Sequence, residues 1–239
     1  MEISPYYQLK CVFVGEPSVG KTSIMNLIHK EKHDPNTEAT IGLGFSNTHV
    51  ELKEYPLSNP ENLPDFYKEK NEEYGIIDTN QLISLHLWDT AGSTRFRSIV
   101  KSYLRDIDIC FLVFDMTKKT TFQDLYNWKE EVSKFSNPLY VLIGNKSDLR
   151  NQEITMNQVK ELATIWNIKH YIISCVRFNS SEFIKRIIHI STKDFHDKML
   201  TLLHENKKIP EYIKTSHFKK KFKFIEFDDE ENPKFCCFQ

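Results

Sequence analysis

The chain has 239 residues, of which 40% are hydrophobic and 27% charged, and its net charge is −1. This composition fits a globular protein of one domain with appendages, and the balanced charge excludes a general attraction to nucleic acid. No stretch approaches the roughly 18 consecutive apolar residues of a membrane span, so we expect no transmembrane helix.

The remaining bulk features point to a cytoplasmic protein. The first residues, Met1 to Pro5, lack the apolar core of a secretory signal and the glycine that myristoylation requires. Three of the five cysteines, Cys11, Cys110 and Cys175, lie in or beside apolar stretches. We expect them to be reduced thiols that pack as small apolar groups.

Apolar stretches typical of β-strands alternate along the chain with stretches typical of α-helices. We predict strands near 8–14, 44–52, 82–88, 109–115, 139–144 and 170–174, and helices near 21–29, 121–135, 155–167 and 180–204. This order predicts an α/β fold with a doubly wound, mostly parallel six-stranded sheet and helices on both faces. The segment 44–52 is the expected antiparallel edge strand, paired with 82–88.

The first strand leads into a phosphate-binding loop of the form G-x-x-x-x-G-K-[ST], which runs from Gly15 to Thr22. Its glycines let consecutive backbone N–H groups turn toward a polyphosphate, and the N-terminus of the following helix adds its positive end. Lys21 would reach the β- and γ-phosphates, and the Thr22 hydroxyl would ligate Mg²⁺.

The third strand ends in Trp88-Asp89-Thr90-Ala91-Gly92. An aspartate at this strand end can hold the shell of Mg²⁺, usually through water, and the N–H of Gly92 can meet a γ-phosphate. Only a glycine lets the backbone approach so closely. By itself the segment would indicate a strand and a turn, but after a phosphate loop it indicates a second part of the same site.

The fifth strand is followed by Asn145-Lys146-Ser147-Asp148. The Asp148 carboxylate can accept hydrogen bonds from N1–H and the 2-amino group of guanine, whereas adenine offers no such pair of donors. The stem of Lys146 would cover one face of the base. Because the motif follows the phosphate loop along the chain and stands at the end of a strand, it predicts selection of guanine.

Taken in order, these motifs resemble those of the Ras superfamily of small GTPases, and several resemble its Rab branch. Thr40-Ile41-Gly42-Leu43-Gly44-Phe45 is similar to the Rab segment T-I-G-x-x-F, and the run from Trp88 to Phe96 is similar to W-D-T-A-G-Q-E-R-F. Tyr103-Leu104-Arg105 stands where Rabs carry Y-Y-R, and Ser174-Cys175-Val176 resembles S-A-K. The resemblance covers residues 6–192 and the paired cysteines of the tail.

The resemblance implies a GTP/GDP switch that requires Mg²⁺, and it assigns three groups of site residues. The nucleotide-binding residues would be Gly15, Ser18, Val19, Gly20, Lys21, Thr22, Ser23, His33, Thr40, Gly92, Asn145, Lys146, Asp148, Ser174, Cys175 and Val176. The metal site would be made by Thr22, Thr40 and Asp89. The residues of GTP hydrolysis would be Lys21, Thr40, Gly92 and Ser93.

Several positions depart from the family pattern. Ser93 stands where the family carries the glutamine that positions the attacking water, and serine is too short for that role. Pro17 lacks an N–H and crowds the γ-phosphate side of the loop. His33 replaces an aromatic ring that meets guanine edge-on, and Val176 replaces a lysine. We therefore expect slow intrinsic hydrolysis.

The resemblance also implies partners and a cellular location. Phe45, Trp88 and Tyr103 match the aromatic positions that Rabs present to effectors. An exchange factor, a GTPase activator and prenyl-Rab chaperones are expected, and nucleic acid is not. We expect the protein in the cytoplasm and on the cytoplasmic face of an intracellular membrane.

Two segments fall outside a plain small-GTPase domain. We expect the domain over 1–205, interrupted by an insertion near 53–78, and a flexible tail over 206–239. The insertion is either a passive surface loop or a partner-binding element. The tail carries a basic run, Lys219 to Lys223, which suits anionic lipid headgroups, and an acidic run, Asp228 to Glu231, which opposes them.

The tail ends in Cys236-Cys237-Phe238-Gln239. The paired cysteines resemble a Rab prenylation site, with a geranylgeranyl group on each, and they also fit a C-a-a-X box with Cys236 as the single target. One lipid chain gives reversible membrane binding, whereas two give stable anchoring.

Two other functions stay open at this stage. A nucleotide-binding scaffold of GTPase fold with negligible turnover would account for Ser93 and Pro17. A P-loop enzyme that uses an adenine nucleotide would account for the phosphate loop but not for Asp148.

Overall fold

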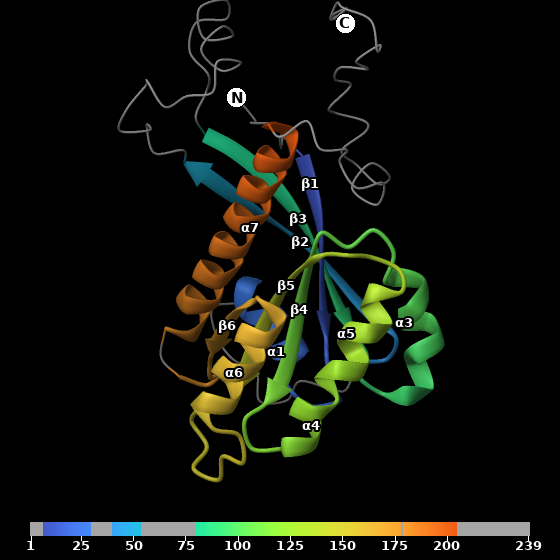
Figure 1. The fold of residues 1–239 in the computed structure, drawn as a ribbon, viewed down its shortest axis with the longest axis vertical. Helices are drawn as coiled ribbons and strands as arrows, with labels where there is room; N and C mark the ends of the chain where they lie inside the picture. Colours follow the sequence, from blue (N-terminus) through green and yellow to red (C-terminus); the bar gives the residue numbers. More distant parts are fainter. Residues whose placement is uncertain (1–6, 30–39, 54–79, 178, 205–239) are drawn as a thin grey trace, which may run out of the picture.

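The computed structural model describes residues 7–29, 40–53, 80–177 and 179–204, which are the coloured part of Figure 1. His33, the expected insertion after Lys53 and the tail from residue 205 lie outside the described residues.

The described residues form a six-stranded sheet with the strand order β2-β3-β1-β4-β5-β6. Its strands are β1 (Tyr7–Val14), β2 (Leu43–Lys53), β3 (Asn80–Thr90), β4 (Ile109–Asp115), β5 (Leu139–Asn145) and β6 (Lys169–Ile172). All neighbouring pairs are parallel except β2 and β3, which are antiparallel. The predicted sheet and its antiparallel edge strand are confirmed.

Helices lie on both faces of this sheet (Figure 1). They are α1 (Lys21–His29), α3 (Arg97–Tyr103), α4 (Lys119–Gln123), α5 (Leu125–Ser133), α6 (Met156–Trp166) and α7 (Ser180–His204), with a single 3₁₀ turn, η2 (Thr94–Phe96), before α3. Buried side chains of α1 and α7 pack on one face, and those of α3, α5 and α6 pack on the other.

Two details of the helix prediction were wrong. The single helix expected near 121–135 is two helices that meet at Asp124, where the backbone ψ is −10 and the α-helical geometry is interrupted. Helix α3 was not predicted, because it is short and shows only Val100 and the following Leu104 as buried apolar residues.

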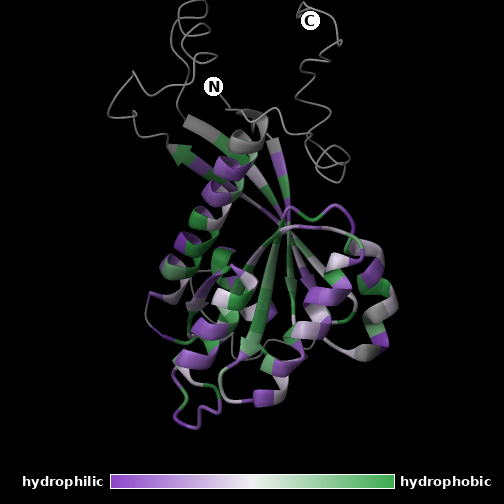
Figure 2. Cartoon of the chain, viewed as in Figure 1, coloured by the Kyte–Doolittle hydropathy of each residue, from purple (hydrophilic) through white to green (hydrophobic). Residues whose placement is uncertain are grey.

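The core is divided by the sheet into two apolar clusters. Alternate residues of β4 point to opposite faces: Phe111 and Val113 join the cluster under α1 and α7, whereas Leu112 and Phe114 join the cluster under α5 and α6. All residues of β4 are buried, as expected for a central strand covered on both faces. Figure 2 shows the hydrophobic centre of the sheet, with hydrophilic residues on the outer sides of the helices.

Cys11, Cys110 and Cys175 are buried free thiols, as predicted. Within the described ranges, none of the helices is both long and apolar enough to cross a membrane.

This topology brings the sequence motifs to one edge of the sheet. The parallel strands β1, β3, β4, β5 and β6 all end there, and the loops after β1, β3 and β5 carry the three motifs. Since β1 lies between β3 and β4, the phosphate loop follows the strand at which the winding of the sheet reverses. Ligands of doubly wound folds bind at this point.

Candidate nucleotide and magnesium site

The phosphate loop joins β1 to α1 and depends on two glycines. Gly15 and Gly20 have φ angles of 147° and 101°, which side chains rarely allow. A Cβ atom at Gly15 would lie 2.1 Å from the Val113 carbonyl oxygen, and one at Gly20 would lie 2.2 Å from Nδ2 of Asn145. The loop therefore packs against the ends of β4 and β5 in a way that only glycine permits at these two positions.

Lys21 lies at the start of α1 and is buried under this loop. Its ammonium donates hydrogen bonds of 2.8 Å to the carbonyl oxygens of Gly15 and Glu16. Burial lowers the pKa of Lys21 to about 8, although the carboxylates of Asp89 and Glu16 act in the opposite direction. An ammonium has three protons, so one remains for a further acceptor, and an anion there would offset the cost of burial.

Three oxygens from three different segments meet beside Lys21. The hydroxyls of Thr22 and Thr40 donate to Oδ2 of Asp89 at 2.5 Å and 2.9 Å, and the two hydroxyl oxygens are 2.8 Å apart. Two hydroxyl protons are too few for three short oxygen–oxygen contacts while Asp89 is ionised. Such a group of hard oxygen donors suits Mg²⁺.

Asp89 supplies the second indication of a cation. The residue is buried, and its Oδ1 atom has no hydrogen-bond partner among the described residues. Burial raises the pKa of Asp89 above its ordinary value, although the two threonine hydroxyls and the Lys21 ammonium lower it. An unpaired buried acceptor costs about 1–3 kcal/mol, and a bound cation would remove that cost. The residues present therefore fit the expected metal.

Gly92 lies directly against the phosphate loop. A Cβ atom at this residue would lie 2.4 Å from both the Glu16 carbonyl carbon and the Pro17 nitrogen. Because Gly92 has no side chain, the backbone after β3 lies against the phosphate loop, as the expected contact of the Gly92 N–H with a γ-phosphate would require.

The base-side loop after β5 is connected to the phosphate loop by Asn145. Its Nδ2 donates a hydrogen bond of 2.9 Å to the Val19 carbonyl oxygen, and its Oδ1 accepts from the thiol of Cys175 at 3.5 Å. Asn145 is 2% exposed, so both contacts are shielded from water. This residue fixes the spacing between the loops expected to hold phosphates and base.

Lys146 occupies a left-handed conformation, with φ of 65°. Its ammonium forms an ion pair of 2.7 Å with the buried Asp115 at the end of β4. Burial alone would raise the pKa of Asp115, but the Lys146 ammonium and the hydrogen bonds from Thr117 lower it below its ordinary value. The charged end of Lys146 is therefore held by the protein.

The loop is attached at its other side to the segment after β6. The Ser147 N–H donates to the Ile173 carbonyl at 3.1 Å, and Arg177 donates to the Ser147 carbonyl at 3.2 Å. Asp148 follows in the same loop and is half-buried, with part of its surface open to solvent.

The remaining predicted residues are divided by the structure into two groups. The first group lies in the described part of the chain. The phosphate loop and the first turn of α1 contain Ser18, Thr22 and Ser23. The segment after β6 contains Ser174, Cys175 and Val176, and Ser93 precedes η2. His33, Cys236 and Cys237 lie outside the described residues.

The three predicted aromatic positions are in contact. Phe45 and Trp88 are cross-strand partners with ring centroids 4.7 Å apart, and Trp88 lies 5.1 Å from Tyr103 of α3. Phe45 is 53% exposed, whereas the indole of Trp88 packs against the core cluster under α3 and α5. Together they form a continuous aromatic strip from the sheet edge to α3.

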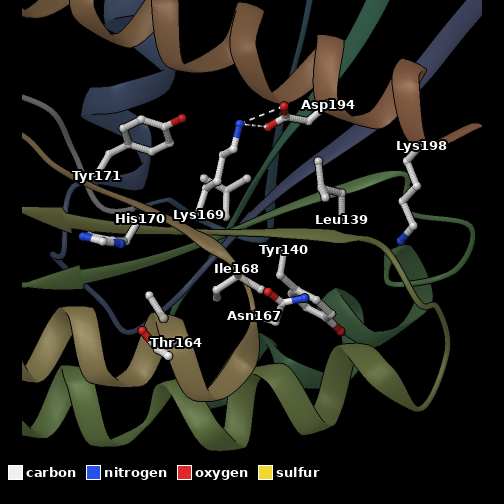
Figure 3. Close-up of a pocket in the computed structure, with 12 residues that line it drawn as sticks. Leu139, Tyr140, Thr164, Asn167, Ile168, Lys169, His170, Tyr171, Asp194 and Lys198 are labelled. Atoms are coloured by element: carbon white, nitrogen blue, oxygen red, sulfur yellow. Dashed lines mark hydrogen bonds and ion pairs between the residues drawn. The ribbon is translucent and has the colours of Figure 1, made fainter.

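An open groove lies elsewhere on the described part of the chain. Its volume is about 830 Å³, and it is lined by the starts of β5 and β6, the end of α6, and α7. Figure 3 shows the ion pair between Lys169 and Asp194 in this groove, with distances of 2.7 and 2.8 Å. None of the predicted site residues lines it, and it faces the edge where the parallel strands begin. The candidate nucleotide site therefore rests on the chemistry of the motifs and not on the volume of a groove.

Two contacts of the site were not foreseen from sequence. Asp115 holds Lys146, and Trp128 of α5 donates from Nε1 to Oε1 of Glu16 at 3.0 Å. Each contact joins segments far apart in the chain, so no local pattern in the sequence could indicate it.

Comparison with known proteins agrees with this geometry. A model of the Ras family matches residues 10–59 and 65–193. Ras-related protein RABA6a of Arabidopsis thaliana is 31% identical over 160 residues, which are 66% of this chain and 58% of that protein. The chain therefore covers less than two thirds of the length of this relative. On the family match and the site together, the chain belongs to the Ras family, and its resemblance within that family is to the Rab type.

Proposed function

We propose that this protein is a Rab-like small GTPase, a switch between GTP-bound and GDP-bound forms that acts in intracellular membrane traffic and hydrolyses GTP slowly. The observation that carries the proposal is the hydrogen bond from Asn145 to Val19, which joins a complete phosphate loop to a guanine-selecting loop. Asp89 and its two threonines lie beside that phosphate loop with the donor set of a Mg²⁺ site.

In this proposal, the phosphate loop and Lys21 hold the phosphates. The free proton of the Lys21 ammonium would reach the β- and γ-phosphates while its other two keep the loop carbonyls of Gly15 and Glu16 in place. Asp148 would accept from N1–H and the 2-amino group of guanine, and the N–H of Cys175 would donate to O6. The ion pair with Asp115 leaves the aliphatic stem of Lys146 as the part that covers the base.

Thr22, Thr40 and Asp89 would hold Mg²⁺, directly or through water. When bound, Mg²⁺ would neutralise charge on the phosphate oxygens. Thr40 and Gly92 belong to two different segments that both border the phosphate loop, so both can respond to the presence of a γ-phosphate. Loss of that phosphate would release both segments, and this is the proposed switch.

Two residues make the proposed hydrolysis slow. Ser93 follows Gly92 where the family has a longer amide side chain that orients the attacking water, and its hydroxyl is too short to span water and phosphate. Pro17 offers no N–H to the phosphates and occupies the γ-phosphate side of the loop. Ser93 thus removes a group that would act on the water, and Pro17 removes one backbone donor, while Lys21, Thr22, Thr40 and Asp89 are all present.

The aromatic strip of Phe45, Trp88 and Tyr103 is the proposed effector face. It joins β2, which follows Thr40, to β3 and α3, which lie before and after Gly92 in the chain. A change at the phosphates can therefore change this surface. An exchange factor, a GTPase activator and prenyl-Rab chaperones are proposed as further partners on the family resemblance.

The proposed membrane attachment rests on the sequence of the tail. The domain would extend over 1–205, and the tail over 206–239 would carry prenyl groups on Cys236 and Cys237. The protein would then reside in the cytoplasm and on the cytoplasmic face of an intracellular membrane.

The second candidate is a nucleotide-binding scaffold with negligible turnover, which Ser93 and Pro17 favour. A single-turnover assay with γ-labelled GTP separates the two candidates. Phosphate release faster than that of Lys21→Ala supports the GTPase. Release no faster than that control, even with candidate activators, supports the scaffold.

The first prediction concerns the base. Asp148→Asn should lower the affinity for GDP by roughly a hundredfold or more, because two hydrogen bonds to a charged acceptor are lost. The same variant should gain affinity for xanthosine diphosphate, whose 2-carbonyl suits an amide donor. Titration with both nucleotides measures this, and Asp197→Asn on the outside of α7 is the matched control. Guanine selection would be contradicted if Asp148→Asn kept the unmodified protein's preference for GDP over xanthosine diphosphate. It would also be contradicted if the unmodified protein and Asp148→Asn both bound ATP tightly.

The second prediction concerns the metal. Asp89→Asn should lower the affinity of the protein–GDP complex for Mg²⁺ by roughly tenfold or more, since the amide lacks the charge that holds the cation shell. The measurement is the rate of GDP release as a function of free Mg²⁺. Asp108→Asn is the control, because Asp108 accepts the Lys10 N–H at 2.7 Å at the other end of the sheet. Equal Mg²⁺ dependence in all three proteins would refute the assignment.

The third prediction concerns turnover. Ser93→Gln should raise the single-turnover rate of GTP hydrolysis by roughly tenfold or more, within the range of a positioned catalytic group. Ser102→Gln, on the exposed side of α3, should leave the rate unchanged. If Ser93→Gln hydrolyses GTP no faster than the unmodified protein, the short side chain is not what limits turnover.

The fourth prediction concerns the tail. Intact mass spectrometry of the protein from its native cell should show one or two added prenyl groups. Cys236→Ser should remove all modification if the end is a C-a-a-X box, and should leave one group if both cysteines are modified independently. An unmodified mass for the membrane-isolated protein would exclude lipid anchoring at these residues.

A further inference from the structure

Glu16 of the phosphate loop is held by α5, a helix with no part in any of the sequence motifs. The indole Nε1 of Trp128 donates a hydrogen bond of 3.0 Å to Oε1 of Glu16. Trp128 is 3% exposed and belongs to the core cluster on its face of the sheet. The donor is thus fixed by packing, and the bond has a charged acceptor, which makes it stronger than a neutral one.

The backbone of Glu16 is in contact with two proposed phosphate-sensing residues. Its carbonyl oxygen accepts from the Lys21 ammonium at 2.8 Å. Its carbonyl carbon and the Pro17 nitrogen lie against Gly92, where a Cβ atom would come within 2.4 Å. The peptide between Glu16 and Pro17 therefore lies between Lys21 and Gly92. The position of this peptide determines how the Lys21 ammonium and the Gly92 backbone are placed relative to one another.

Pro17 makes a side-chain anchor at this point valuable. Proline has no N–H, so this part of the loop has one fewer backbone donor than other residues would give it. Pro17 and Ser18 are both exposed, and Ser18 has φ of 62°. The loop thus turns at an exposed pair of residues, immediately after the residue that Trp128 holds.

Helix α5 also contacts α3, which follows Ser93 and η2. Glu131 lies three residues after Trp128, on the same side of α5, and forms an ion pair of 3.0 Å with Lys101 of α3. The Lys101 side chain is 49% exposed, so this pair is weak, and the bond to Glu16 is the stronger of the two links. A single helix therefore contacts the phosphate loop and the helix beyond Gly92.

We propose that Glu16 and Trp128 form a positioning pair for the phosphate loop, which holds the Glu16–Pro17 peptide so that Lys21 and Gly92 face the same phosphate. The inference rests on the proposed function and deepens it, because it assigns a role in nucleotide retention to residues outside the motifs. Neither residue is a catalytic group, since both act through the loop backbone.

The test compares the release of a fluorescent GDP derivative from four variants of the full chain. Trp128→Phe keeps an aromatic ring in the core and removes only the donor, and Glu16→Ala removes the acceptor. Each should accelerate release on the order of tenfold, and the double variant should release no faster than either single variant, because both changes remove the same bond. Glu16→Gln keeps an acceptor oxygen and should retain most of the slow release.

Trp166→Phe is the matched control, because Trp166 lies at the end of α6, where its ring packs against Tyr126. It should release GDP at the unmodified rate. Release unchanged by Trp128→Phe, or accelerations that multiply in the double variant, would overturn the positioning pair. A lower melting temperature without faster release would reduce the contact to a structural one and would overturn it too.

A second measurement separates failure of the pair from failure of the proposed function. The chain has three tryptophans, so ¹⁵N-labelled protein should show three indole N–H signals, and Trp128→Phe identifies one of them. Glu16→Ala should shift that signal and leave the Trp166 signal in place. If this holds but the unmodified protein binds no GDP, the proposed function fails. If GDP binds and the variants release it normally, the positioning pair alone fails.

Discussion

The hydrogen bond from Asn145 to the Val19 carbonyl is the contact on which the rest of the site depends. It joins the loop after β1 to the loop after β5 across the edge of the sheet, and it is shielded from solvent because Asn145 is buried. The absence of a side chain at Gly20 makes room for the amide, since a Cβ atom would lie 2.2 Å from it. The distance between the groups proposed to bind the phosphates and the base is thus set by the protein itself, which would lower the ordering cost of binding.

The same edge of the sheet contains charged groups that the fold does not neutralise by itself. Lys21 is buried with a lowered pKa, and Asp89 is buried with an oxygen that lacks a partner among the described residues. Both groups make the ligand-free fold less stable, and under the proposed function both would gain partners from an anion and a cation that bind together. Ligands that bind only the folded state add to its stability by mass action. The proposed nucleotide binding would therefore stabilise the folded domain.

The sequence was sufficient to predict the positions of the strands, the doubly wound sheet and its antiparallel edge strand. Strong apolar periodicity located the strands, and the three motifs fall at strand ends that a doubly wound sheet must bring together. Helix α3 was not predicted because so few of its residues face the core. The ion pair of Lys146 with Asp115 was not predicted because the two residues belong to different segments of the chain. What periodicity and motifs cannot give is the pairing of side chains between distant segments.

The contact of Glu16 with Trp128 illustrates what such pairings add to the function. The motif rule treats the four residues between the glycines of a phosphate loop as variable, so the motif itself assigns no role to Glu16 or Pro17, and Pro17 stands out only as a departure from the family pattern. In the fold, Glu16 is anchored by the buried indole of Trp128, and Pro17 removes a backbone donor at the same turn. Helix α5 thus anchors the loop at the residue before the proline, which itself has no backbone N–H to donate. Under the proposed positioning role, a change in α5 would alter the retention of nucleotide without any change to the residues proposed to touch the ligand.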